Sequence, residues 1–158
     1  MKIRPAEVSD YVEVAQLVNT PEALFQISRS ATFPWSVAQL EDVARQREAL
    51  TVCVHEGKVI GFANLYQVQA GQSAFIGNVV VSESYRGHGF GKRLLNYMIA
   101  LIENEYRAEA HLSVFGFNTA ATMLYKSLGF LPYDVEATED YTGKKVTLIH
   151  MKKAVPCW

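Results

Sequence analysis

The fold is decided by the stretch Val79-Val-Val81-Ser-Glu-Ser-Tyr-Arg86-Gly-His-Gly89-Phe-Gly91-Lys92. Here an apolar strand runs through a short polar loop into a glycine-rich helix start. Glycine lets the backbone approach a ligand closely, and the first amides of a helix have no partner within the helix. Together with the helix dipole, these amides form an anion site suited to a pyrophosphate. Arg86 and Lys92 add positive charge at the same end.

Glycines alone are a weak signal, because a tight turn also needs them for steric reasons. The spacing excludes two other phosphate-binding motifs. The dinucleotide fingerprint needs a third glycine at the sixth position, which is Lys92 when counted from Gly87. Counted from Gly89, that position is Leu94. A P-loop would need a glycine where Arg86 stands.

Two motifs carry a resemblance to a known family. The segment from Arg86 to Gly91, RGHGFG, resembles the R/Q-x-x-G-x-G/A signature of the GNAT superfamily of N-acetyltransferases. The segment from Asn118 to Phe130, NTAATMLYKSLGF, is similar to that family's second motif, N-x-x-A-x-x-x-Y-x-x-x-G-F. The likeness covers nearly the whole chain. It implies a single N-acetyltransferase domain over residues 1–158, of mixed α/β class, with a mostly antiparallel central sheet of about seven strands and about four flanking helices.

The apolar pattern predicts where these elements lie. Ser9 or Asp10 can cap a first helix with an apolar stripe at Val12, Ala15, Leu17 and Val18. Residues 21–34 are expected to be irregular or a short helix, and Ser36 and Gln39 form a capping-box pattern. An edge strand near residues 145–151 could pair between subunits, which leaves a homodimer open. Strands are expected at 1–4, 50–55, 58–68, 74–81, 110–114, 130–135 and 145–151, and further helices at 36–47, 89–102 and 118–128.

Composition narrows the class of partner. The chain has 158 residues, 15 of them basic and 16 acidic, for a formal charge of −1. A nucleic-acid partner is not expected, because such proteins carry a basic excess. Neither a disulfide framework, which Cys53 and Cys157 would have to form, nor a metal site is expected. The polar start and short apolar runs predict a cytoplasmic protein without a membrane partner.

The resemblance implies acetyl-coenzyme A as co-substrate. In this family a bulge splays the strand at 79–81 from the strand at 110–114, and the pantetheine arm bonds to backbone amides in the slot. A backbone amide there would also stabilise the oxyanion of the reaction. The residues implied to hold the co-substrate are Val79, Val80, Val81, Arg86, Gly87, His88, Gly89, Phe90, Gly91, Lys92, Asn118, Ala121 and Tyr125.

Tyr125 is implied as the general acid for the departing thiolate. It shares one helix face with Asn118 and Ala121, which supports this role. The alternative is that Tyr125 is simply a core aromatic residue. A free tyrosine has a pKa of ~10 and a thiol of ~8.5, so full proton transfer is uphill by roughly 2 kcal/mol. We therefore expect Tyr125 to act mainly as a hydrogen-bond donor.

The general base is not evident. Many relatives carry a glutamate in one of two places, which are Phe75 and Ser113 here, and neither side chain can act as a base. His111 should share the strand face of Ser113 and is the candidate base, directly or through water. The alternative for His111 is a histidine at the sheet edge or in a polar pocket. His55 and His150 are predicted to be ordinary strand residues.

A weak base favours an acceptor that loses its proton easily. Deprotonating a lysine-like amine of pKa ~10.4 at pH 7 costs roughly 4.6 kcal/mol, whereas an α-amine of pKa ~7.8 costs about 1.1. We therefore expect an α-amine or another amine of low pKa to be the better acceptor.

The segment Phe33-Pro-Trp35-Ser36 is expected to cover the acceptor site, as this region does in the family. It also resembles the branch that acetylates the N-terminal alanine of a ribosomal protein, but that branch normally carries a glutamate where Ser113 stands. The alternative for Phe33 and Trp35 is a hydrophobic staple at the helix entry. Glu136, Glu139 and Asp140 could attract a cationic amine or merely solvate a loop. The expected acceptor-side residues are Phe33, Trp35, Phe75, Ser113 and Tyr141.

The sequence thus predicts an enzyme that moves an acetyl group from acetyl-coenzyme A to the primary amine of a small molecule, an amino acid or a peptide N-terminus. A non-catalytic sensor of acyl-coenzyme A is the alternative, since both glutamates are missing while Tyr125 is kept.

Overall fold

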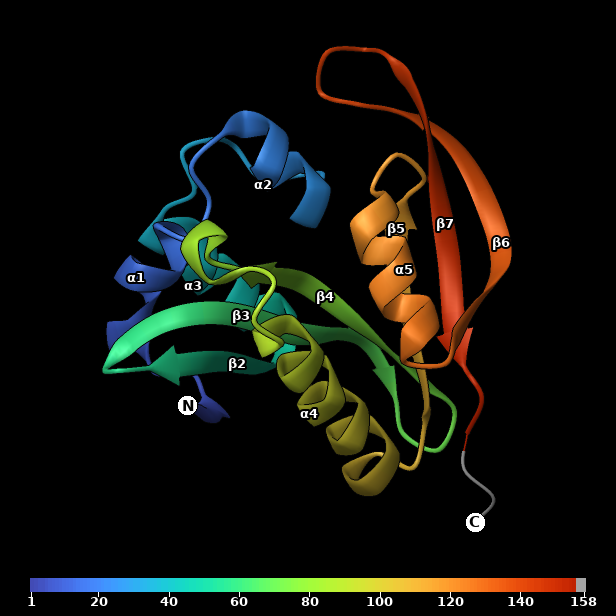
Figure 1. Ribbon diagram of the computed structural model, residues 1–158, viewed down its shortest axis with the longest axis horizontal. Coiled ribbons are helices and arrows are strands. Elements are labelled where there is room, and N and C mark those ends of the chain that lie inside the picture. The colour runs from blue at the N-terminus through green and yellow to red at the C-terminus, as the bar shows by residue number, and fades with distance from the viewer. Residues whose placement is uncertain (156–158) are drawn as a thin grey trace.

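The computed structural model describes residues 1–155, and in this part of the chain a seven-stranded mixed sheet carries five α-helices (Figure 1). This confirms the predicted α/β class and the seven strands. Cys157 lies outside the described residues. The strands are β1 Lys2–Pro5, β2 Glu48–His55, β3 Lys58–Gln69, β4 Ser73–Val81, β5 Glu109–Phe115, β6 Phe130–Glu139 and β7 Lys145–Lys153; the helices are α1 Tyr11–Ala15, α2 Pro21–Ile27, α3 Val37–Gln46, α4 Phe90–Glu105 and α5 Thr119–Ser127.

Helices cover both faces of the sheet. On one face, α4 and α5 pack over β3, β4 and β5 (Figure 1). On the other face, α1 and α3 pack over β2 and β3. The inner face predicted for α4 is confirmed, and burial of each such large side chain contributes about 2 kcal/mol. The buried side chains of α4 are Leu94, Leu95, Met98, Ile99 and Ile102.

The sheet opens in its middle, between β4 and β5. These strands are the one parallel pair among the described strands, and their pairing runs only from Ser73↔Glu109 to Phe75↔His111. Beyond that point β4 contains a bulge, visible as a register shift against β3, and Asn78 there has a positive φ of 50°. A bulge bends its strand and increases the local twist. The bulge implied by the resemblance is therefore present, and it leaves a slot between the two strands.

Asn78 is held in place by three hydrogen bonds. Its Nδ2 donates to the Ile27 carbonyl at the end of α2 (2.6 Å), and its Oδ1 accepts from Asn64 Nδ2 (2.7 Å) and from Arg47 Nη1 (3.1 Å). The Arg47 guanidinium also lies over the Tyr66 ring, 4.4 Å from its centroid. The strained residue is thus fixed by buried polar partners rather than by packing alone.

The expectation that residues 145–151 form an edge strand is wrong. β7 lies inside the sheet, in the order β1-β2-β3-β4-β5-β7-β6, so the edges are β1 and β6. The hairpin folds back so that β7 pairs with β5 and buries Leu148 and Met151, whereas β6 is mostly exposed. β7 therefore has no free edge with which to pair another subunit.

The first helix also differs from the expectation. A short 3-10 turn at Val8–Asp10 precedes α1, so Tyr11 and Val14 face the core and Val12 is 55% exposed. Asp10 makes no side-chain cap to α1. Its carboxylate instead accepts two bonds from Arg4, at 2.8 and 2.9 Å, and these lower the pKa of Asp10.

The remaining helix predictions hold with one change. The region 21–34 contains the short helix α2, capped by Thr20. Ser36 Oγ accepts from the Gln39 amide (3.2 Å) as a capping box requires. The Gln39 side chain does not return to the Ser36 amide, however; it bonds the backbone of Thr32. Within residues 1–155, none of the helices combines the length and apolar character needed to cross a bilayer.

Candidate active site

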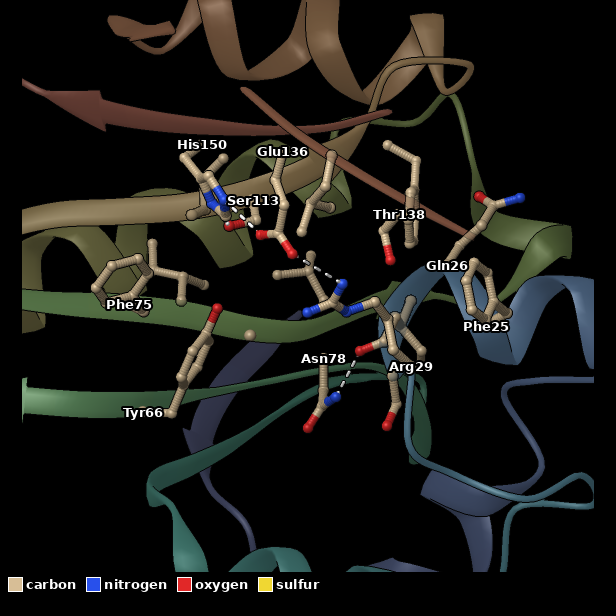
Figure 2. Close-up of a pocket in the computed structure, with 18 of the residues that line it drawn as sticks. Phe25, Gln26, Arg29, Tyr66, Phe75, Asn78, Ser113, Glu136, Thr138 and His150 are labelled. Carbon is tan, nitrogen blue, oxygen red and sulfur yellow. Dashed lines mark hydrogen bonds and ion pairs between the residues drawn. The ribbon is translucent and has the colours of Figure 1, made fainter. Parts of the chain in front are cut away.

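A cleft of about 950 Å³ occupies the opening between β4 and β5 (Figure 2). Its walls come from the end of α2, from β3 to β7, and from Tyr125 of α5. This volume lies in the range of small-molecule sites. The cleft is therefore the candidate active site, and most of its lining comes from segments far apart in sequence.

The glycine turn is built to leave backbone amides free. Gly87 and Gly89 have φ values of 80° and 83°, a conformation that favours glycine, and the space where their side chains would begin is open. The first amide of α4 that donates backward is that of Arg93, to the Gly89 carbonyl at 3.1 Å. In the described part of the chain, the amides from Gly87 to Lys92 have no hydrogen-bond partner in the protein. Such a turn at a helix start fits a pyrophosphate.

The side chains around the glycine turn differ in exposure and in what they contact. Arg86 is exposed, and its Nε donates to the Val81 carbonyl (3.2 Å), which ties the turn to the end of β4. His88 and Lys92 are exposed. A Cβ on Gly91 would lie 3.6 Å from Val81 and 3.9 Å from Leu124 of α5, so the start of α4 lies close to both walls of the slot. Phe90 is half-buried against the His55 ring, at 5.0 Å.

On β4, the predicted residues alternate between faces. Val79 lines the cleft, whereas the Val80 side chain packs into the core formed with α1 and α3. Val80 can therefore offer only its backbone to the cleft. Val81, at the end of the strand, is half-buried.

The second motif places Tyr125 at the cleft. Asn118 Oδ1 accepts from the Ala121 amide (3.1 Å) and caps α5, while its Nδ2 donates to Gln26 of α2 (3.1 Å). Asn118 thus fixes the helix that carries Tyr125, and Ala121 is half-buried one turn before it. Tyr125 lines the cleft, and burial raises its pKa to about 12. It remains protonated at neutral pH and can only donate a proton or a hydrogen bond.

His111 does not line the cleft. It lies at the closed end of the slot, beside the Phe75 ring at 4.9 Å. Both of its nitrogens are engaged, Nδ1 with the Tyr133 hydroxyl (2.9 Å) and Nε2 with Glu109 (2.8 Å). This placement matches the alternative interpretation of His111 as a histidine in a polar pocket.

The cleft instead holds a chain of polar groups that the sequence did not reveal. Ser113 Oγ lies 2.7 Å from His150 Nδ1, and His150 Nε2 lies 3.1 Å from Glu136 Oε1 (Figure 2). Glu136 Oε2 lies 3.7 Å from the Arg29 guanidinium. All four residues line the cleft. The signal that could have found His150 is its register opposite Ser113, but this requires knowing that β7 lies beside β5.

The expected acceptor-side residues divide into two groups. Phe75, Ser113 and Tyr141 line the cleft, whereas Phe33 and Trp35 do not. Trp35 is 5% exposed and packs against Phe62 in the core. Leu40, four residues into α3, belongs to the same core cluster, so Trp35 occupies the place of a hydrophobic staple.

The wall formed by β6 and the hairpin that follows it is rich in carboxylates. Glu136, Glu139 and Asp140 all line the cleft. Asp140 is used within its own hairpin, where its Oδ1 accepts from the amides of Thr142 and Lys144 at 2.9 Å. Glu136 is bonded to His150 and paired with Arg29, which leaves Glu139 as the carboxylate facing the cleft for which residues 1–155 offer no side-chain partner. Among the described residues there is no cluster of three or more His, Cys, Asp or Glu side chains able to hold a metal ion.

Comparisons with known proteins agree with this geometry. The model of the acetyltransferase (GNAT) family matches residues 14–130. The ribosomal protein bS18-alanine N-acetyltransferase of Escherichia coli is 30% identical over 115 residues, which cover 73% of this chain and 76% of that protein. Its crystal structure superposes with a TM-score of 0.78 at 25% identity, covering 99% of this chain and 95% of the other. A spermidine N-acetyltransferase from Vibrio cholerae shares the fold, with a TM-score of 0.76 at 20% identity and coverage of 97% and 94%.

Proposed function

Because this chain belongs to the acetyltransferase (GNAT) family, it is an N-acetyltransferase, and we propose that it acetylates an α-amine, such as a peptide N-terminus, with acetyl-coenzyme A as donor. The described residues form one sheet with its helices, and we propose that residues 1–158 act as a single domain.

The observation that carries this proposal is the meeting of the glycine turn with the slot. Free amides from Gly87 to Lys92 would hold the pyrophosphate, and the gap beyond Phe75 and His111 would take the pantetheine arm. The arm would bond the exposed backbone of β4 near Val79. A backbone amide of the same stretch would stabilise the developing oxyanion.

Tyr125 would serve the leaving group. Because its pKa is about 12 and that of a thiol is ~8.5, full proton transfer is uphill by roughly 5 kcal/mol. This gap is larger than for a free tyrosine. Tyr125 therefore stabilises the departing thiolate chiefly by donating a hydrogen bond, and solvent completes the protonation.

The acceptor side supports an amine that enters as a cation and loses a proton in the cleft. Glu139 would attract the ammonium group, since Glu136 is engaged by His150 and Arg29. An α-amine costs about 1 kcal/mol to deprotonate at pH 7, against roughly 4.6 for a lysine side chain. The name of the Escherichia coli relative, an alanine N-acetyltransferase, points to the same kind of acceptor.

A thiol-release assay tests the proposal. Acetyl-coenzyme A would be supplied with a short peptide bearing a free N-terminal alanine, with an Nα-blocked lysine peptide and with spermidine. We expect turnover with the first to exceed turnover with the other two at neutral pH. A preference for the lysine peptide or spermidine would overturn the α-amine assignment. Calorimetric binding of coenzyme A without turnover on any amine would indicate the sensor instead.

A further inference from the structure

We propose that His150, reached through the Ser113 hydroxyl and oriented by Glu136, accepts the proton that the acceptor amine loses. The inference rests on the proposed N-acetyltransferase function and names the proton acceptor that the chain otherwise lacks. Phe75 and Ser113 stand where many relatives have a glutamate, and neither is a base.

The hydrogen bonds fix the state of the imidazole. A carboxylate can only accept, so the bond between Glu136 Oε1 and His150 Nε2 (3.1 Å) places the proton of the neutral ring on Nε2. Nδ1 then carries the lone pair and accepts from the Ser113 hydroxyl at 2.7 Å. Ser113 also shares a side-chain hydrogen bond with Tyr66, and a remaining lone pair of its Oγ can accept from an amine in the cleft. The hydrogen bonds from Ser113 through His150 to Glu136 therefore all donate in the same direction, away from the cleft.

The fold holds this chain firmly. Ser113 and His150 are direct partners in the antiparallel ladder of β5 and β7, and β7 is paired on its other side with β6. Arg29, two residues beyond the end of α2, lies 3.7 Å from the second oxygen of Glu136 and helps to hold the carboxylate in place. Figure 2 shows the Tyr66 hydroxyl of β3 pointing toward Ser113, with which it shares a hydrogen bond.

Other candidate bases in or near the cleft fit less well. Both nitrogens of His111 are occupied, and it lies outside the cleft lining. Burial raises the pKa of Tyr66, which makes it a donor at neutral pH. Asp140 is held in its own hairpin by three bonds to its Oδ1 and has no link to Ser113 within residues 1–155. Glu139 lines the cleft but has no link to Ser113 among the hydrogen bonds of residues 1–155.

The proton and electron balance is simple. The acceptor enters as an ammonium ion, and its nitrogen loses two protons in all. The neutral amine nitrogen forms its bond to the thioester carbonyl carbon as the carbon–sulfur bond breaks with its electron pair on sulfur; the second proton then leaves for solvent, and solvent protonates the thiolate. The first proton, lost before the attack, passes to Ser113 Oγ, while the Ser113 hydroxyl proton passes to His150 Nδ1. The resulting imidazolium is stabilised by Glu136 and releases its proton to solvent before the next turnover. Neither oxidant nor metal is required.

The decisive comparison is between His150→Gln and His111→Gln in the full chain, with the alanine-terminated peptide as acceptor. Glutamine keeps a polar side chain of similar length, and a general base contributes about 10²-fold or more. We expect His150→Gln to lower kcat about 100-fold without changing coenzyme A affinity, and His111→Gln to change kcat less than about threefold. The reverse pattern would overturn the proposal in favour of His111.

The pH profile separates proton transfer from mere structural support. The neutral ring is the reactive form, so the wild-type rate should rise with pH and then level off. In His150→Gln the rise that reports the histidine should disappear, so that the rate depends on pH only through the fraction of acceptor present as free amine. The charged and titratable groups around the ring are Glu136, Asp134 and Tyr133 of β6, Tyr66 of β3, and Arg29 just after α2, so Glu136→Gln should shift the rise rather than abolish it. If the rise of the rate with pH were unchanged in His150→Gln, His150 would not be the proton acceptor.

Ser113→Ala tests the relay itself. Water can replace a hydroxyl imperfectly, so we expect a loss of about tenfold in kcat with the rise of the rate with pH retained. Intact-mass measurement with acetyl-coenzyme A alone should show no acetylated enzyme; an acetyl group on Ser113 would replace the relay by a covalent route. If the wild-type protein turns over no amine at all, the proposed function fails, whereas normal turnover in His150→Gln overturns only this inference.

Discussion

The two parts of the candidate site are constructed differently. The part that would hold the co-substrate adjoins the cleft and is made of backbone from one continuous stretch, the end of β4 and the turn from Gly87 to Lys92. The part that would hold the acceptor is made of side chains from α2 and the residues just after it, and from β5, β6 and β7, such as Arg29, Ser113 and His150. Backbone amides can bind the same co-substrate whatever the side chains of the turn are. The side chains of the other part determine which acceptor binds and how it is deprotonated. The difference explains why the first part can be recognised from a short motif and the second cannot.

The largest effect is expected where the two parts are joined, at Asn78. Asn78→Ala removes the bond to the Ile27 carbonyl, leaves Asn64 Nδ2 without its acceptor, and leaves Arg47 Nη1 with Asn64 Oδ1 alone. Buried unsatisfied groups and a non-glycine residue at positive φ should together cost about 3 kcal/mol of unfolding free energy, or about 9 °C in Tm. Calorimetry checks this. Asn78→Gly loses the same bonds without the strain and should lose about 1 kcal/mol less; an equal loss would mean that strain plays no part.

Tyr125→Phe should give the next largest effect. The variant loses the hydrogen bond to the departing thiolate, a bond to a charged group worth about 2 kcal/mol, so kcat should fall about 30-fold. The ring and its contact with Phe130 are kept, so coenzyme A affinity by calorimetry should stay within about twofold. Unchanged turnover would remove the acid role from Tyr125, and a matching loss of affinity would make it a binding residue instead.

Gly89→Ala should have the smallest effect and tests the backbone part alone. Alanine at a φ of 83° is strained by about 1 kcal/mol, and relaxing the turn would misalign its amides. Coenzyme A affinity should fall about fivefold. Gly71→Ala is the matched control, since Gly71 has a φ of 77° with equally open space but lies in the turn between β3 and β4, away from the start of α4. Both variants should lose similar stability; equal loss of affinity would show that the turn does not bind the co-substrate.

Much of the fold could be predicted because its signals are local. Alternating strands, helix stripes and the glycine C-terminal to α5 fixed each element to within a few residues, and the bulge in β4 lies where the family resemblance placed it. The wrong predictions concern features that depend on contacts between residues far apart in the sequence or on the structure of a preceding segment. Val12 turned outward because a 3-10 turn preceded α1, and β7 moved inside the sheet because its hairpin folded back onto β5.

The candidate site, like the fold, could be predicted where the signal is local and not where it depends on the order of the strands. Tyr125 and Phe75 line the cleft, as expected. Trp35 is in the core, since an apolar residue before a helix serves packing as readily as binding. Ser113 and His150 are 37 positions apart, and only the order of the strands brings them together. A single sequence carries no local pattern for such a pair.

The side-chain amide of Asn78 connects two walls of the cleft, the bulged strand β4 and the end of α2. The same residue makes the bulge that sets the width of the slot and holds the last carbonyl of α2, next to Arg29. The gap in the sheet and the position of α2 therefore cannot be varied independently. Any sequence change that widens one side of the cleft must also move the other, which limits how far the choice of acceptor can drift while the donor site stays intact.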